Sequence, residues 1–524
     1  MTAPTVLPSA HPRHPLAWTW RRELKAYPPA ATRRLHLGLV VLITVALYYE
    51  LYVGGGVATL ILGQLHMSFG MLVTVLAISN LAGAFASLLA GLCDRFGRAN
   101  LVVYGLLVVG LLTLFAAPAV QTRLEWAAVT VAIGFIEGII LVATPALIRD
   151  FSPQLDRATA MGFWTIGPVL GSLMVSLATS LTLPVYQSWQ SQYVFCGAVG
   201  LVVFALAFVF LRELAPALRD QLVVSDHDRR LVEARARGLD IEARLRHPWR
   251  QMLRPDIIAS AFGVSVLLLI YYTLAAFGVI YFVITFGYSV AEANGLLNWS
   301  WGANALALIA AGLLSDRLRV RKPFMLFGGI GTATMIVLFL QQAGQHPSHA
   351  ALVAISCALF ALLGFAYTAW MASFTETLEA HNPALTATGL AIWGWLLRIV
   401  VTASFLALPH VVNTVTPLIE APAWIAAYRE MIASHVMPGP DMLAHLAVIQ
   451  QAAADSAGQW RSWYWICLAG TLVFVALIPT MKGRWSPAAA KADEDAHDEA
   501  VERELARLQA TGALNTVCAY RRKG

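Results

Sequence analysis

Three ionisable residues lie inside long apolar stretches of this sequence, and they are its strongest candidates for chemistry. Glu50, Glu137 and Arg398 each interrupt a run of mostly hydrophobic residues that is long enough to cross a bilayer. A charged side chain at mid-membrane costs about 2.5–3.5 kcal/mol on insertion scales, so the few that occur are functional candidates by default.

The two glutamates suit proton transfer. Burial disfavours a charged carboxylate, so Glu50 and Glu137 could take up and release protons within the membrane. Residues 47–56 give Glu50 an aromatic, glycine-rich setting that is unlike a lipid-facing surface. The sequence therefore favours proton coupling, and polar packing between helices is the alternative for both residues.

Arg398 suits the binding of an anion. Its guanidinium group stays charged and offers a fork of donors that matches a carboxylate. It is a candidate anchor for an anionic substrate, and a structural ion pair with a glutamate is the alternative. The candidate walls of this substrate site are Tyr271, Tyr272, Tyr367, Trp370 and Trp395.

The elements that must position these residues are membrane helices. Of 524 residues, 58% are hydrophobic and 13% are charged, which is outside the range of soluble globular proteins. Twelve apolar runs predict an all-α integral membrane protein with twelve transmembrane helices in two sets of six. The runs lie at about 36–60, 70–90, 101–118, 127–148, 158–183, 193–211, 257–287, 289–314, 324–342, 351–373, 386–412 and 461–481.

The positions of Lys and Arg predict the orientation of these spans. One side holds only Arg123, Arg429 and Arg461, and nearly all the other cations lie on the opposite side. The positive-inside rule makes the richer side cytoplasmic, with both termini. An even number of spans independently puts the two termini on one side. We expect a monomeric, multi-pass protein of the inner cell membrane.

The polar segments complete the predicted organisation. The central loop suits short amphipathic helices at the membrane, and the external insertion has the helical spacing of a small cap. The predicted segments are a cytoplasmic N-terminal segment 1–35, a first bundle 36–212, a cytoplasmic central loop 213–256, a second bundle 257–482 with the external insertion 413–460, and a cytoplasmic tail 483–524.

Other classes of function lack their sequence signatures. The five cysteines are scattered without metal-ligand or disulfide spacing. The net charge of +6 comes without a nucleic-acid-binding motif, and no nucleophile–base pair or phosphate loop is visible. We expect no enzyme activity, no cofactor, no metal and no nucleic-acid partner.

Two charged loops indicate an internal repeat. Residues 91–98 (GLCDRFGR) separate spans 2 and 3, and residues 312–322 (GLLSDRLRVRK) separate spans 8 and 9. A loop carboxylate could bind the positive end of a helix dipole in the other half, and a loop arginine could pair with a carboxylate. Such loops would be gates; the alternative is that the arginines only anchor the membrane surface. The gating candidates are Asp94, Arg95, Arg98, Asp316 and Arg317.

With these loops, the chain resembles transporters of the major facilitator superfamily over essentially its whole length. The family's loop reads Gly-x-x-x-Asp-Arg-x-Gly-Arg-Arg/Lys. The matching positions are Asp94, Arg95, Gly97 and Arg98, and the departures are Ala90, Ala99 and, in the second copy, Arg319. The resemblance implies two pseudo-symmetric six-helix bundles that expose a central site to each side in turn.

The resemblance also implies a direction of transport. Glu50 resembles the span-1 acidic residue of several proton-coupled organic-acid symporters, and Glu137 resembles the span-4 glutamate of the anion:cation symporter branch. These matches predict proton-coupled uptake of a small organic anion. The alternative is proton-driven efflux of an amphiphilic compound, since residues 167–171 (GPVLG) resemble the span-5 motif of family antiporters. A receptor built on a transporter scaffold is a third reading, against which neither terminus carries a recognisable signalling domain.

Small and polar residues elsewhere predict how helices pack. Asn294, Asn298 and Asn304 of span 8 are expected to bond neighbouring helices. Pairs of glycines five residues apart begin spans 5 and 11, where small residues allow close helix contact.

Overall fold

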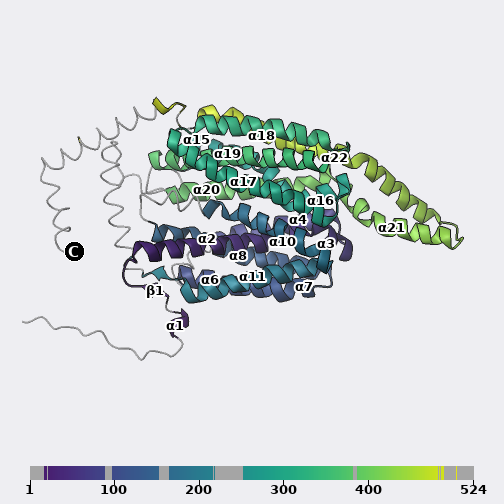
Figure 1. The fold of residues 1–524 in the computed structure, drawn as a ribbon, viewed down its shortest axis with the longest axis horizontal. Helices are drawn as coiled ribbons and strands as arrows, with labels where there is room; N and C mark the ends of the chain where they lie inside the picture. The colour runs from purple at the N-terminus through teal and green to yellow at the C-terminus, as the bar shows by residue number, and fades with distance from the viewer. Residues whose placement is uncertain are drawn as a thin grey trace, which may run out of the picture.

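In the computed structural model, the chain is a bundle of long helices (Figure 1). Twelve described helical segments are long and apolar enough to cross a membrane, which confirms the predicted fold class. Within a bilayer every backbone polar group needs an internal partner, and a helix provides it. The structure describes residues 17–20, 22–88, 97–152, 164–215, 218, 252–381, 386–481, 483, 485–488 and 503.

The first six spans form one half of the bundle, drawn in purple to teal in Figure 1. They are α2 (Ala30–Gly56), α4 (Phe69–Leu88), α6 (Arg98–Leu111), α8 (Arg123–Phe151), α10 (Gly167–Tyr186) and α11 (Trp189–Phe210). Three short elements extend two of these spans: α3 (Ala58–Gln64) follows α2, while the π-helix Leu112–Ala116 and α7 (Ala117–Ala119) follow α6.

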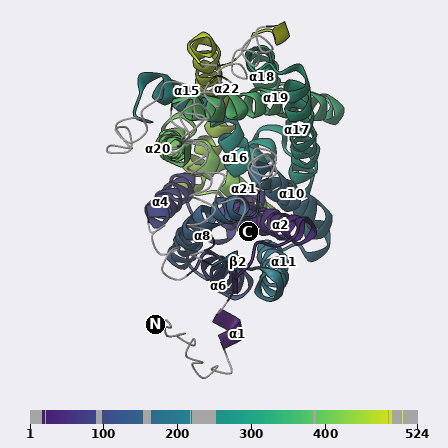
Figure 2. The same ribbon diagram turned by 90° about the vertical axis from the view of Figure 1, so that its left-hand side faces the viewer.

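The last six spans form the second half, drawn in teal to yellow. Figure 2 looks along the helices and shows this half above the first. Span 7 is divided into α15 (Pro255–Leu267) and α16 (Leu269–Phe286). The other spans are α17 (Val290–Leu318), α18 (Lys322–Gln342), α19 (His349–His381), α20 (Thr386–Val411) and α22 (Pro440–Leu477), which the 3₁₀ turn Ile478–Thr480 extends.

Local sequence signals set two of the helix starts. Thr122 and Glu125 form a capping box at the start of α8, and Ser289 and Glu292 form one at the start of α17. In each box the two side chains bond backbone N–H groups that the first turn leaves without partners. As a result, α8 begins four residues before its predicted apolar run, and α17 begins within one residue of its predicted run.

The end of the bundle where α2 begins is called the terminal end here, and the opposite end the hairpin end. At the terminal end, β1 (Glu23–Leu24) pairs in parallel with β2 (Glu213–Leu214). Arg22 is 1% exposed. Its Nε donates to Asn100 Oδ1 (3.1 Å), and its guanidinium carbon lies 4.7 Å from the centre of the Phe208 ring. The segment before α2, which ends in α1 (Ala17–Trp20) and β1, is thus tied to the first half.

A helical hairpin projects from the hairpin end. It consists of α21 (Val415–Ala433) and the first part of α22, and Figure 1 shows it extending past the other helices. The predicted helical character is confirmed, but the predicted cap is wrong, because α22 continues for 38 residues without a break and carries the hairpin away from the bundle. Gln459 closes the base: its Oε1 accepts from the amides of Asn413 (2.9 Å) and Thr414 (3.2 Å).

The two charged loops differ in their backbone course. Gly97 and Arg319, which the loops align, both have a positive φ, but Gly97 has φ 86° and ψ 137° before α6, whereas Arg319 has φ 54° and ψ 30° at the end of α17. Arg319 is thus in the left-handed region, where a residue with a side chain is strained. The two copies share a positive φ at this position and not the same turn.

The packing expectations are met in part. Asn304 Nδ2 donates to the Phe360 carbonyl (2.6 Å) and joins α17 to α19, and Asn294 Nδ2 donates to the Gly56 carbonyl (2.8 Å) and joins the two halves. Asn298 Oδ1 has no partner in the described part of the chain.

The glycines at the starts of spans 5 and 11 behave differently. A Cβ on Gly167 would lie 2.5 Å from Thr44 Cγ2, and one on Gly171 would lie 2.5 Å from Tyr48 Cβ, so α10 packs closely on α2. On α20, a Cβ on Gly389 would clash with the Leu378 side chain of α19, whereas one on Gly394 would meet no atom within 4 Å. The expectation of close packing therefore fails at Gly394.

Candidate functional site

Glu137 is a buried carboxylate of the first half that lies within electrostatic range of the second. It lies in α8 with 1% of its surface exposed, and neither carboxylate oxygen has a hydrogen-bond partner among the described residues. Its charge interacts with those of Glu50 in the same half and Arg398 in the other. An isolated buried charge is costly, so this environment suits a group that exchanges a proton.

Close packing of α8 against α4 holds Glu137 in place. A Cβ on Gly138 would lie 2.3 Å from the Gly83 carbonyl oxygen, and one on Gly134 would lie 2.1 Å from Ser79 Oγ. Each helix thus presents two small residues four apart, the pattern that lets membrane helices approach closely. Glu137 directly precedes Gly138, so the same helix contact fixes the backbone position from which the Glu137 side chain extends.

We expect Gly138→Ala to lower the free energy of unfolding by about 1–3 kcal/mol, because the added methyl group overpacks two backbones in contact. Thermal unfolding of the purified protein in detergent would measure the loss. Gly394→Ala is the matched control, since its methyl group would enter open space. Equal losses from the two substitutions would contradict the role of the α4–α8 contact.

Glu50 faces a helix of its own half. It is 2% exposed, and both its carboxylate oxygens have no partner in the described part of the chain. A Cβ on Gly200 of α11 would lie 2.0 Å from Glu50 Oε1, so the glycine makes room for the carboxyl group. The thiol of Cys196, also on α11, interacts electrostatically with Glu50 and Glu137. The two carboxyl groups form one buried acidic cluster.

Arg398 bridges the halves from α20. Its Nη1 donates to the carbonyl (3.2 Å) and to Oδ1 (3.3 Å) of Asn80 on α4. Asn80 Nδ2 in turn donates to the Arg398 carbonyl (3.2 Å) and to Thr402 Oγ1 (2.9 Å). No described carboxylate forms an ion pair with Arg398 in this arrangement. Asn80 was not predicted as a site residue, because its only signal in the sequence is a lone amide inside span 2.

The tyrosine candidates gather near this arginine. Tyr271 and Tyr272 lie with their ring centres 5.2 Å apart, and Tyr367 interacts electrostatically with Tyr272 and with Tyr48 of α2. Tyr48 also interacts with Arg398 and Glu137. Tyr48 was not predicted as a site residue, although Tyr48 lies two residues before Glu50 in the aromatic stretch.

The two tryptophan candidates lie elsewhere. Trp370 is fully buried in the second half, where its Nε1 donates to Ser260 Oγ (3.0 Å) and its ring stacks on Phe374 at 4.8 Å. It supports Tyr367, whose ring centre is 6.2 Å away. Trp395 instead meets the ring of Phe85 edge-on at 6.2 Å, across the contact between α20 and α4.

The charged loops form ion pairs at the terminal end. Asp94 and Arg95 lie outside the described residues. Arg98 Nη1 lies 2.8 and 2.7 Å from the two carboxylate oxygens of Asp150 at the end of α8, and its amide donates to Glu213 Oε2 (2.8 Å). The expected pairing of a loop arginine with a carboxylate is thus present within the first half.

The second loop uses a different arginine. Arg321 pairs with Asp316 (2.6 Å) and with Glu376 of α19 (3.0 Å). Arg317 lies in the last turn of α17. Like the Arg98 pair, these contacts stay within one half.

Contacts between the halves are found at the hairpin end and mid-bundle. Besides the Asn80–Arg398 bonds, Asn294 donates to the Gly56 carbonyl and the Phe69 amide donates to Thr416 Oγ1 (3.0 Å). All ion pairs that join described residues lie within a single half. The hydrogen bonds between described residues of the two halves therefore lie at the hairpin end and mid-bundle, and the Phe85 and Trp395 rings meet nearer the terminal end.

The chain is similar to known transporters in sequence. The model of the Major Facilitator Superfamily matches residues 40–407. The multidrug resistance protein MdtL of Shewanella oneidensis is 32% identical over 158 residues, 29% of this chain and 36% of that protein. An MFS-type efflux pump of Mycolicibacterium smegmatis is 25% identical, with 55% and 65% covered, and a cis,cis-muconate transport protein of Acinetobacter baylyi is 22% identical, with 51% and 60% covered. The chain thus spans between about one third and two thirds of these relatives.

Solved structures show the same fold. A bacterial homolog of the human lysosomal transporter Spinster, in an inward-facing and unoccupied conformation, superposes with a TM-score of 0.63 at 16% identity. That alignment covers 88% of this chain and all of the other. A D-xylose–proton symporter gives a TM-score of 0.60 at 14% identity, covering 86% and 97%.

Proposed function

The chain belongs to the major facilitator superfamily, and we propose that it carries a small organic anion together with protons across the inner membrane by alternating access. The observation that carries this proposal is that Glu137 of one half and Arg398 of the other lie within range of each other's charge, without a direct ion pair. A proton site and an anion site then lie close to the seam, which is the contact surface between the two halves.

That electrostatic interaction suggests how protons and anion are coupled. When Glu137 is charged, it attracts the Arg398 guanidinium and competes with an incoming anion. When Glu137 is protonated, the full charge of Arg398 is available to a substrate carboxylate. Proton binding and anion binding therefore favour each other, as a symporter requires.

The other predicted residues take supporting roles in this proposal. Glu50 is the second proton site, and Tyr271, Tyr272 and Tyr367 are walls of the substrate site. Trp370 holds Tyr367 from behind, and Trp395 is proposed to line the substrate site where α20 meets α4. The gating role is proposed for Asp94, Arg95, Arg98, Asp316 and Arg317.

The positive-inside rule makes the terminal end cytoplasmic in this proposal. The described hydrogen bonds between the halves then lie toward the external side and mid-bundle. The proposed segments are those derived from the sequence, with bundles at 36–212 and 257–482.

Efflux is the second candidate, because two of the curated relatives are named for multidrug resistance or efflux. The third is named for cis,cis-muconate, a dicarboxylate, and favours the organic-anion reading. The two candidates differ in the direction in which protons move relative to the substrate.

Proteoliposomes that contain a pH-sensitive dye would decide between them. With cis,cis-muconate as the test anion, we expect substrate entry and acidification of the lumen to occur together. Ethidium, an amphiphilic cation, serves as the comparison, and protein-free liposomes give the background. Proton movement opposite to ethidium, with no muconate uptake, would overturn the symport proposal in favour of efflux.

A further inference from the structure

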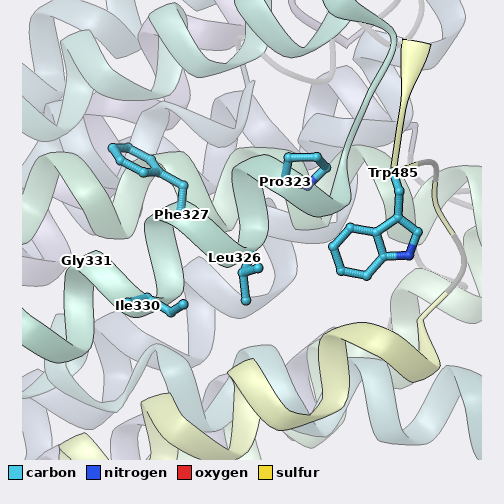
Figure 3. Close-up of a pocket in the computed structure, with 6 residues that line it drawn as sticks. All are labelled: Pro323, Leu326, Phe327, Ile330, Gly331 and Trp485. Carbon is cyan, nitrogen blue, oxygen red and sulfur yellow. The ribbon is translucent and has the colours of Figure 1, made fainter. Parts of the chain in front are cut away.

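A groove on the surface of α18 is a candidate lipid site. It has a volume of about 440 Å³, and Figure 3 shows it between the side chains of one helix face and an indole ring from the segment after α22. Its lining residues are Pro323, Leu326, Phe327, Ile330, Gly331 and Trp485. Phe327 is 60% exposed and Ile330 51% exposed on a membrane-spanning helix. The groove therefore opens toward lipid chains.

The first half carries a groove at the equivalent place. It has a volume of about 370 Å³ and lies between α6 and α8, with Trp20 from the segment before α2. Asp94 is aligned with Asp316 in the two charged loops. In that alignment four of the α18 lining residues correspond one by one to α6 residues that line the first-half groove. The corresponding residues are Pro323, Leu326, Phe327 and Ile330 on α18, and Leu101, Tyr104, Gly105 and Val108 on α6.

A tryptophan from each terminal segment lines these grooves. Trp20 is 54% exposed and Trp485 is 49% exposed, and both lie at the terminal end of the bundle, where α6 and α18 begin. Tryptophan favours this level of a membrane, where its ring meets acyl chains and its N–H meets head groups. Two unrelated segments thus place the same side chain at repeat-equivalent apolar grooves, which indicates a common occupant.

The two grooves place their cations differently at this end. Lys322, the first residue of α18, donates from Nζ to the Pro479 carbonyl (3.1 Å) and lies 5.2 Å from the centre of the Trp485 ring. No described carboxylate forms an ion pair with it, whereas the neighbouring Arg321 is paired twice. At the repeat-equivalent position of the first half is the neutral Asn100, whose Oδ1 accepts from the buried guanidinium group of Arg22.

We propose that the α18 groove binds an anionic phospholipid, with an acyl chain along Leu326 and Ile330 and the phosphate near Lys322. Lys322 is 6% exposed, and largely buried charges are normally paired. A phosphate would supply the negative partner that the described residues do not provide. Basic pockets beside membrane helices bind anionic head groups in this way.

Native mass spectrometry of the purified, full-length protein in detergent tests this directly. Phosphatidylglycerol and phosphatidylcholine with identical acyl chains are the probes. We expect the native chain to retain phosphatidylglycerol more strongly. Lys322→Gln should weaken that binding about fivefold, the contribution of one basic residue near a lipid surface, and leave phosphatidylcholine binding unchanged. Lys322→Arg should restore the preference.

Two further variants separate the site from general attraction to charge. Lys25→Gln removes one exposed cation from the terminal end of the other half and should leave both lipids bound as before. Ile330→Trp fills the groove from an exposed position and should displace phosphatidylglycerol although Lys322 is intact. Equal effects of Lys322→Gln and Lys25→Gln, or full binding by Ile330→Trp, would overturn the proposal.

Discussion

A carrier in which Glu137 is replaced by Gln should exchange substrate across the membrane but no longer concentrate it. The amide mimics the protonated carboxyl group and cannot release a proton, so the empty carrier has no proton-driven step to reset it. Counterflow in proteoliposomes should persist, while uptake driven by a pH gradient should fall until internal and external concentrations are equal. The paired measurement separates loss of coupling from loss of binding.

Two variants sharpen that result. Glu50→Gln tests the second carboxyl group of the cluster, and loss of accumulation in only one of the two variants would identify the coupling residue. Glu292→Gln is the control, because Glu292 is an exposed capping residue at the start of α17. Full pH-driven accumulation by both Glu50→Gln and Glu137→Gln would end the assignment of the proton site.

Arg398→Ala should weaken substrate binding roughly 10- to 100-fold. A hydrogen bond to a charged group contributes about 1.5–3 kcal/mol, and each 1.4 kcal/mol is tenfold in affinity. The half-saturating concentration of cis,cis-muconate in counterflow would report the change. Arg398→Lys keeps the charge without the planar fork and should give an intermediate loss.

Asn80→Ala distinguishes the two partners of that arginine. It removes the side-chain acceptor on α4 and the hydrogen bond that the Asn80 amide donates to Thr402, but leaves the guanidinium group in place. We expect substrate affinity to be retained or to rise, since an acceptor that competes with the substrate has been removed. A loss as large as that of Arg398→Ala would mean that Arg398 is a structural bridge rather than an anchor.

The helical framework and the seam residues were predictable because they depend on local signals. Twelve apolar runs are long enough to span a bilayer, and an ionisable residue inside such a run has few structural reasons to be there. Glu137 and Arg398 stand out for that reason, and the structure brings them within electrostatic range. The carboxylate partner of Arg98 could not be predicted, because Asp150 is far from Arg98 in the sequence.

Features that depend on distant contacts were not predictable. Nothing near Glu50 in the sequence points to Gly200, the residue that makes room for it. Trp370 reads as a site aromatic because it follows Tyr367 by one helical turn, yet its indole bonds Ser260 inside the second half. Only the fold decides which face of α19 turns toward the seam.

The unbroken course of α22 makes the hairpin a lever. About 20 of its 38 residues are enough to cross the bilayer, so roughly 18 residues, or about 27 Å at 1.5 Å per residue, extend beyond it. A stiff arm of that length magnifies a small rotation of the second half into a displacement of several ångströms at its tip. The turn between α21 and α22 is therefore the place where an optical or spin label would record the conformational cycle with the largest amplitude.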